Sequence, residues 1–201
     1  QYISLVRMTK NAYDADDISL LRLLGEKAPR RGIKIKVLPS LASPAALGII
    51  RPTIFFPEGF DFDNTELVKC VLLHEAGHIK YFHTLIKILS TVMLCLFWYN
   101  PLVWVMYVYL DRDMEISADR YVIKNIGVEN RTIYANALIN AAEDMTRREV
   151  FCFHFKSSQL RERVEAVIKY KKLSVGALII TFIVPLALFT VFATTDTVLT
   201  G

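Results

Sequence analysis

The sequence has little of what marks a secreted, disulfide-linked or nucleic-acid-binding protein. Three cysteines in 201 residues are too few for a disulfide scaffold, and their odd number suits a reducing compartment. A formal net charge of +4 is too small and too dispersed to predict direct binding of nucleic acid. The chain opens with Gln1 and shows no signal-peptide pattern, so we expect it to be part of a longer polypeptide.

Apolar residues are abundant and concentrated. They make up 53% of the chain, which excludes a disordered protein. Two runs, Ile88–Leu110 and Leu173–Thr195, each hold 23 residues without a charged side chain. Runs of that length are candidates for membrane helices, and they argue against a freely soluble enzyme.

The spacing of apolar residues outside these runs predicts an α+β fold that is mainly helical, with a small antiparallel sheet. Alternating and proline-bounded segments predict strands at 32–38, 45–50, 53–56 and, as an edge strand, 151–156. Helical periodicity predicts helices at 15–28, at 131–145, at 158–170 and from Asp63 onward, where Asp63 and Glu66 have the spacing of a capping box.

The helix that begins near Asp63 contains the motif His-Glu-x-x-His at residues 74–78. Positions i and i+4 of a helix face the same way, so His74 and His78 can bind one tetrahedral Zn²⁺. Glu75 lies one step around the helix, where it can take a proton from a water at the metal. The motif therefore predicts a zinc hydrolase, with Glu75 as the catalytic general base.

A catalytic zinc needs a third protein ligand. Asp111, Glu115 and Asp119 are spaced four residues apart, which stacks three carboxylates on one helical face. Their mutual repulsion destabilises the helix unless a cation neutralises it. We predict that Glu115 is the third ligand and that Asp119 hydrogen-bonds a ligand histidine from outside the metal sphere. The alternative is a solvated acidic face.

The first apolar run separates His78 from Glu115. A straight helix of that length would hold the two residues roughly 35 Å apart, which is too far for one metal ion. Pro101 interrupts helical hydrogen bonding and disfavours the helical conformation at Asn100. We therefore predict a membrane-embedded, re-entrant helical hairpin over residues 85–110 that turns at Asn100-Pro101, with two arms that are each about half a bilayer long.

The second apolar run follows five basic residues between 161 and 172, and Asp196 is the only charged residue in the sequence after it. The positive-inside rule then predicts a metallopeptidase domain at 1–172 on the cytoplasmic side, a transmembrane helix at 173–195, and an extracellular start of a further region at 196–201.

Four motifs in order resemble the BlaR/MecR family of bacterial membrane metallopeptidases, which are antibiotic-sensing signal transducers of the gluzincin type. They are Ser43–Gly48 with Arg51-Pro52, Leu72–His78, Asn100–Trp104 and Asp113–Asp119. The resemblance implies zinc bound by His74, His78 and Glu115, in a multi-pass protein of the bacterial cell membrane.

The resemblance also implies a substrate, namely a winged-helix transcriptional repressor or the protein itself, and a place in the induction of β-lactam resistance. Two other functions stay open: a quality-control protease of the HtpX/Ste24 kind, and a non-catalytic relay that zinc stabilises. The oligomeric state is open as well. No Ser-x-x-Lys motif of a penicillin-binding sensor occurs in the 201 residues.

Three further residues could take part in a site, and for each we favour a structural role. We expect His83 at the membrane interface, His154 as an ordinary edge-strand residue and Cys70 as a small buried residue. Strand 53–56 or strand 151–156 could hold an extended substrate by pairing with its backbone.

Overall fold

The structure, a computed structural model, describes residues 12–14, 17–25, 32–39, 41, 43–148 and 153–170. The predicted transmembrane helix at 173–195 lies outside these residues. In chain order the elements are β1 (Tyr13–Asp14), α2 (Asp17–Leu24), β2 (Lys34–Leu38), β3 (Ala45–Leu47), β4 (Thr53–Pro57), α3 (Thr65–Lys80), α4 (His83–Leu96), α5 (Pro101–Ile126), a short 3₁₀ helix (Val128–Asn130), α6 (Arg131–Arg148) and α7 (Phe153–Ile168).

The four strands form one mixed sheet in the order β1-β2-β4-β3. The outer strands β1 and β3 pair antiparallel with their neighbours, but β2 and β4 pair parallel, with Lys34 opposite Thr53. The prediction of an antiparallel sheet was therefore wrong for this central pair. The short β3–β4 hairpin takes the outer edge of the sheet, so that β4 lies beside β2 and runs in the same direction.

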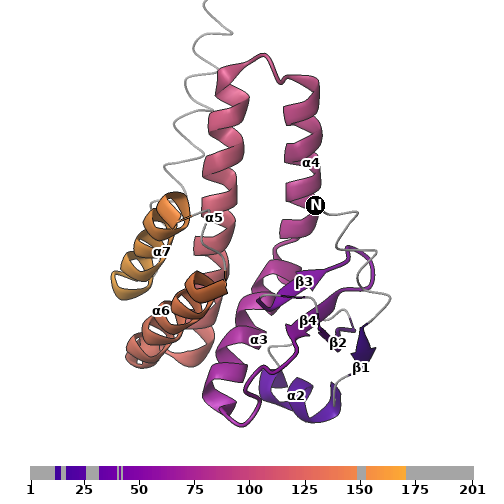
Figure 1. Cartoon of the computed structure of the whole chain (residues 1–201), viewed down its shortest axis with the longest axis vertical. Coiled ribbons are helices and arrows are strands. Elements are labelled where there is room, and N and C mark those ends of the chain that lie inside the picture. Colours follow the sequence, from indigo (N-terminus) through magenta and orange to yellow (C-terminus); the bar gives the residue numbers. More distant parts are fainter. Residues whose placement is uncertain are drawn as a thin grey trace, which may run out of the picture. The chain divides into compact units, whose positions relative to one another are not determined.

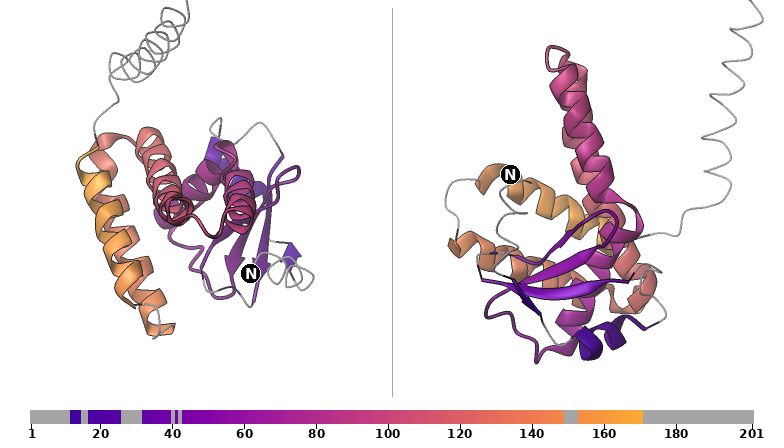
Figure 2. Two further views of the ribbon diagram at one scale, coloured as in Figure 1. Left: turned by 90° about the horizontal axis from the view of Figure 1, so that it is seen from above. Right: turned by 90° about the vertical axis from the view of Figure 1, so that its right-hand side faces the viewer.

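Helices α3 and α5 lie side by side between the sheet and the pair α6 and α7 (Figures 1 and 2). Asn64, and not Asp63, caps α3, because its side chain accepts a hydrogen bond from the backbone N–H of Leu67. The core between the layers is apolar and draws on most elements; its fully buried members include Leu24, Ile35, Ile54, Phe56, Val68, Leu72, Leu73, Val122 and Ile123.

The edge strand predicted at 151–156 is wrong where the structure describes it. Residues 153–156 form the first turn of α7, so His154 lies on a helix. The alternation of apolar residues there is only a few residues long. The sequence that follows has the longer helical period, and a helix of 16 residues begins at Phe153.

The first apolar run is a helical hairpin formed by α4 and the first half of α5, which stand out together from the other elements (Figures 1 and 2). Pro101 is the first residue of α5, and the Asn100 side chain caps the helix by accepting from the N–H of Leu102. The chain therefore turns at Asn100-Pro101, as predicted, whereas the place of residues 85–110 in a membrane stays a prediction.

The hairpin carries large apolar side chains on its surface. Trp98, Tyr99 and Leu102 at the turn are each about two-thirds or more exposed. Further exposed apolar side chains lie along both arms: Leu89, Val92, Met93, Leu96, Phe97, Trp104, Val105, Met106, Val108 and Tyr109. Among the described helices, none is long and apolar enough by itself to cross a membrane; α3 and α4, bent by 54° at their junction, meet that test of length and composition only as a pair.

The bend between α3 and α4 is made by Phe82, whose φ of 56° is left-handed. This conformation costs roughly 1–2 kcal/mol for a residue other than glycine. The bend directs the first residue of α4, His83, back toward the C-terminal half of α3.

Gly77 sets the distance between α3 and α5. A Cβ atom at this position would lie 3.2 Å from the Cα of Ala118 and 3.3 Å from the Cβ of Tyr121. A larger side chain cannot fit unless the helices separate. Because Gly77 lies between the two histidines of α3, this contact also sets how closely α5 approaches them.

We expect Gly77→Val to lower the free energy of unfolding by about 1–3 kcal/mol, because the added methyl groups overpack the α3–α5 contact. Chemical denaturation followed by circular dichroism measures the change. Gly32→Val is the control, since a Cβ at Gly32 meets no atom within 4 Å. Equal effects of the two substitutions would contradict the proposed role of Gly77.

Candidate metal centre

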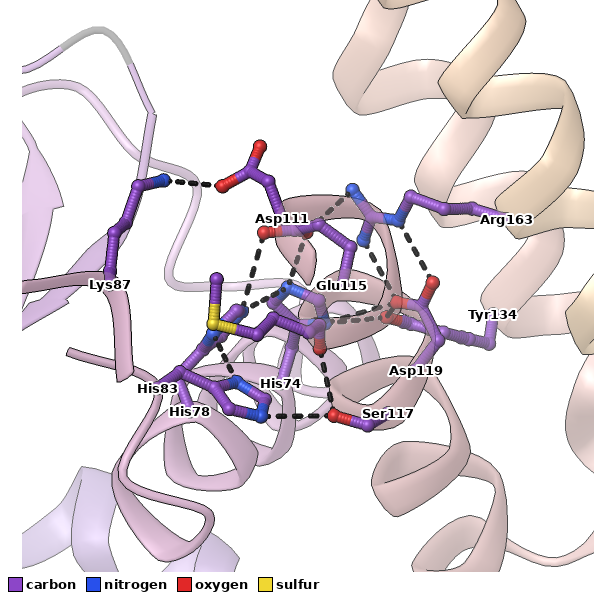
Figure 3. A network of polar contacts seen from close by, with 11 residues as sticks. His74, His78, His83, Lys87, Asp111, Glu115, Ser117, Asp119, Tyr134 and Arg163 are labelled. Carbon is purple, nitrogen blue, oxygen red and sulfur yellow. Dashed lines mark hydrogen bonds and ion pairs between the residues drawn. The ribbon is translucent and has the colours of Figure 1, made fainter. Parts of the chain in front are cut away.

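Two histidines of α3 and one glutamate of α5 point toward a common centre (Figure 3). The Nε2 atoms of His74 and His78 lie 3.1 Å apart. Oε2 of Glu115 lies 3.5 Å from Nε2 of His74, and its Oε1 lies 3.7 Å from Nε2 of His78. One atom from each of these side chains lies within 4.8 Å of the others, the only such group with three or more candidate metal ligands in the described part of the chain.

The separations of these three groups match what a tetrahedral metal ion requires. Metal–ligand bonds of 2.0–2.1 Å at the tetrahedral angle place neighbouring ligand atoms about 3.3 Å apart. The two Nε2 atoms lie 3.1 Å apart, and each lies 3.5 or 3.7 Å from one of the two carboxylate oxygens of Glu115, which is close to that spacing. The nitrogen and oxygen donors are also of the kind that zinc accepts. The residues present therefore fit a metal ion of that size and geometry.

Asp119 lies behind His74, on the side away from this centre. Its Oδ1 atom lies 3.1 Å from Nδ1 of His74, while its support of a metal-binding histidine stays a prediction. Asp119 is 1% exposed and is held by Arg163 of α7, whose Nη2 and Nε atoms donate to the two carboxylate oxygens at 2.8 Å each. Tyr134 of α6 donates a further hydrogen bond to Oδ1 at 2.7 Å. Asp119 is thereby fixed from three helices.

Arg163 also contacts Glu115, with Nη1 3.1 Å from Oε2. One guanidinium thus pairs with two carboxylates of α5. The third carboxylate of the predicted stack, Asp111, does not join them: it accepts a hydrogen bond at 2.6 Å from Nζ of Lys87 in α4. The expected repulsion along α5 is therefore relieved by two side-chain cations as well as by any metal ion.

The charges around the histidines favour one additional positive charge. Burial by itself would lower the pKa of His74, but its hydrogen bonds with Asp119 and Glu115 outweigh burial and raise that pKa to about 10. Burial and the charge on His74 lower the pKa of His78 to about 3. A proton on His74 thus balances the second carboxylate, and a bound metal cation would do the same.

Both carboxylates stay ionised in this setting. Although burial favours their neutral forms, the hydrogen bond from His74 holds the pKa of Glu115 well below its usual range. The hydrogen bonds from Arg163 and His74 lower the pKa of Asp119 to about 2. Glu115 is therefore available as an anionic ligand across the physiological pH range.

Glu75 lies beside the centre and is almost fully buried. Burial raises the pKa of its carboxyl group, while the charge on His74 and a hydrogen bond from the backbone N–H of Ala46 in β3 act in the opposite direction. A buried carboxylate with a raised pKa is suited to take up and release a proton near neutral pH. The contact with Ala46 also places β3 next to this group.

The expectation for His83 was wrong. Its side chain is 6% exposed and belongs to the network around the site, because the bend at Phe82 directs it toward α3. Nδ1 of His83 lies 2.8 Å from Nδ1 of His78, and its Nε2 lies 3.0 Å from Oγ of Ser117 in α5 (Figure 3). Cys70 is buried in the core, as expected, and burial raises the pKa of its thiol to about 11.

Sequence reasoning missed Arg163, Tyr134 and His83 as parts of the site. Arg163 lies 44 residues from its partner Asp119, and nothing in its neighbourhood distinguishes it from the other basic residues of that segment. A signal existed for Tyr134, since a hydroxyl on the apolar face of an amphipathic helix requires a buried partner.

The chain resembles known proteins along most of its length. A family model described as BlaR1 peptidase M56 matches residues 2–167. Regulatory protein BlaR1 of Bacillus licheniformis is 29% identical over 140 residues, which cover 68% of this chain and 23% of that protein. The methicillin resistance mecR1 protein of Staphylococcus aureus is 23% identical over 114 residues, or 56% of this chain and 20% of the relative.

Regulatory protein BlaR1 of Staphylococcus aureus is 27% identical over 117 residues, which cover 56% of this chain and 19% of that protein. The chain thus spans less than a quarter of the length of each of these relatives. The resemblance inferred from the four motifs is confirmed, and the match over residues 2–167 shows that the chain belongs to the BlaR1 peptidase M56 family.

Proposed function

We propose that the chain is the peptidase region of a membrane-bound zinc endopeptidase that acts in bacterial signal transduction. The observation that carries this proposal is the convergence of His74, His78 and Glu115 with the buried Glu75 beside them. Of the metals these donors accept, zinc suits two imidazoles and a carboxylate with one position left for substrate. When bound, zinc would polarise a peptide carbonyl and make water a stronger nucleophile at neutral pH.

The chain's own residues would hold and move the protons of the reaction. Glu75 takes a proton from the attacking water and passes it to the leaving amine, so that the amine departs uncharged. Asp119 accepts a hydrogen bond from Nδ1–H of His74, which leaves the lone pair of Nε2 free for the metal. Arg163 neutralises part of the negative charge that the two carboxylates bring to the site.

We propose β3 as the strand that holds an extended substrate. Of the two strands considered from the sequence, β4 is paired on both sides and 153–156 is helical. Among the described strands, β3 is the edge nearest the site, and the N–H of Ala46 already bonds the carboxylate of Glu75. A peptide aligned along β3 would therefore lie beside the proposed base.

The proposed substrates are the protein itself and a winged-helix transcriptional repressor, in the induction of β-lactam resistance. The names of these three relatives, two of them regulatory proteins and one a methicillin resistance protein, favour signalling over quality control. The buried Glu75 favours an enzyme over a non-catalytic relay, since a structural metal site needs no base. The proposed location is the cell membrane, with the site on the cytoplasmic side.

We also propose that the hairpin over residues 85–110 enters one leaflet of the bilayer and returns. Its surface between Lys87 and Asp111 is mainly apolar and carries no charged side chain, and the ion pair of these two residues closes its base. Each arm rises about 15 Å above that pair, roughly half of the ~30 Å hydrocarbon core. A re-entrant hairpin of this depth leaves α3 and the second half of α5 on the same side of the membrane.

Substitutions in the site should separate metal binding from catalysis. His74→Ala and Glu115→Ala each remove a ligand, so purified protein should contain little zinc by elemental analysis. Glu75→Gln keeps the ligands and should retain zinc, but it should abolish cleavage of the chain itself and of a purified winged-helix repressor, because the amide cannot accept the proton.

Asp111→Asn is the control for Glu115→Ala, since Asp111 lies one turn earlier on α5 and pairs with Lys87 outside the site. It should keep both zinc and cleavage. Undiminished cleavage by Glu75→Gln would contradict the role of the base, and a wild-type chain that binds no zinc would overturn the proposed function.

The raised pKa of His74 predicts that metal affinity depends on pH. Below about pH 10 the metal-free His74 carries an extra proton, and a metal ion must displace it to reach the lone pair. Zinc affinity should therefore rise about tenfold per pH unit between about pH 6 and 9. Calorimetry in buffers of different ionisation enthalpy should detect about one proton released per ion; an affinity independent of pH would contradict this coupling.

Tryptophan fluorescence tests the hairpin, because both tryptophans of the chain, Trp98 and Trp104, lie in it. In vesicles of lipids brominated on their acyl chains, bromine should quench this emission strongly, while acrylamide in the water should quench it weakly. Trp98→Phe and Trp104→Phe assign the signal to each position. Strong quenching by acrylamide without quenching by bromine would place the hairpin outside the bilayer.

A further inference from the structure

Next to the three proposed ligands lies a chain of polar contacts that the proposed reaction does not use. It begins at Nδ1 of His78, the ring nitrogen that faces away from the other ligands, and runs through His83 to Ser117. It ends where Oγ of Ser117 donates to the backbone carbonyl of Met114 at 2.9 Å. Three segments contribute to it: the end of α3, the first residue of α4, and α5.

The direction of these hydrogen bonds follows from what His78 must do. A metal ligand offers the lone pair of Nε2, so the proton of the neutral ring is on Nδ1. That N–H donates to Nδ1 of His83, which must accept and therefore carries its own proton on Nε2. Nε2–H of His83 then donates to Oγ of Ser117, and the Ser117 hydroxyl donates to Met114.

Each ring nitrogen in this series has one role, Oγ of Ser117 both accepts and donates, and the series is consistent from end to end. In the reverse direction, Ser117 would donate to His83 and His83 to Nδ1 of His78. The proton of His78 would then move to Nε2 and block the lone pair that the metal needs. The two directions therefore correspond to a ring of His78 that can bind metal and one that cannot.

We infer that His83 is a positioning residue that holds His78 in its metal-binding tautomer and orientation. The inference rests on the proposed function, because it requires His78 to be a metal ligand. His83 does for His78 what Asp119 does for His74: each supplies an acceptor to the Nδ1–H of a ligand histidine. The bend at Phe82 serves this contact, since it directs the first residue of α4 back toward α3.

A role in packing alone is the competing explanation, and substitutions of His83 separate the two. Oδ1 of an asparagine occupies nearly the same place as Nδ1 of histidine, so His83→Asn keeps the acceptor but loses the outer two ring atoms, Cε1 and Nε2. His83→Leu fills the buried space better but offers no acceptor. Packing predicts that leucine is the milder change, whereas positioning predicts that asparagine is.

The test is zinc affinity of the full chain in detergent, measured by competition with a chromophoric chelator. We expect His83→Leu to bind zinc about 10–100-fold more weakly than wild type, while His83→Asn stays within a few-fold. Ser117→Ala leaves the His83 ring in place but removes the acceptor for its Nε2–H, and we expect a smaller loss. Visible absorption of the Co²⁺-loaded proteins should be alike in wild type and His83→Asn, and altered in His83→Leu.

The outcomes distinguish this inference from the proposed function. If the wild-type chain binds no zinc, the proposed function fails and this inference fails with it. If wild type binds zinc and His83→Leu binds it equally well, or His83→Asn loses as much affinity as His83→Leu, positioning by His83 is overturned while the proposed function stands. Circular dichroism of each variant checks folding. If His83→Leu does not fold, the zinc affinity of Ser117→Ala, which keeps the buried ring, tests the inference instead.

Discussion

The close approach of α3 and α5 at Gly77 is the constraint on which the rest of the structure depends. It brings Glu115 and Asp119 of α5 within reach of His74 and His78, which lie on either side of Gly77 on α3. Because the two helices are joined through the apolar run, the chain must leave α3 and return beside it. The hairpin of α4 and α5 is thus a requirement of the site as well as an apolar projection.

Around this contact, the charges are arranged in pairs that leave room for one more cation. Arg163 cannot neutralise both Glu115 and Asp119, and the proton held by His74 completes the balance. A bound divalent ion would displace that proton and occupy the same electrostatic position. Neutral His78 and His83 provide direction through hydrogen bonds without adding charge to the site.

The sequence was most informative where chemistry depends on short spacings. The His-Glu-x-x-His motif on a helix predicts that His74 and His78 lie side by side. A catalytic metal needs a third ligand, and the turn predicted at Asn100-Pro101 brings Glu115 back to the histidines. The parallel pairing of β2 with β4 could not be predicted, because it depends on which edge a distant strand occupies. His83 was missed because its contact depends on a left-handed backbone at Phe82, and phenylalanine rarely adopts this conformation.

Helix α5 runs without a break from Pro101 at the hairpin turn to Ile126, and Gly77 of α3 holds it at Ala118. A stiff helix held at Ala118 would act as a lever, with its end at the turn about 25 Å from the pivot and Glu115 about 4.5 Å from it. A sideways shift of about 3 Å at the tip would then move Glu115 by about 0.5 Å, which bears on the rate of a reaction that depends on exact placement.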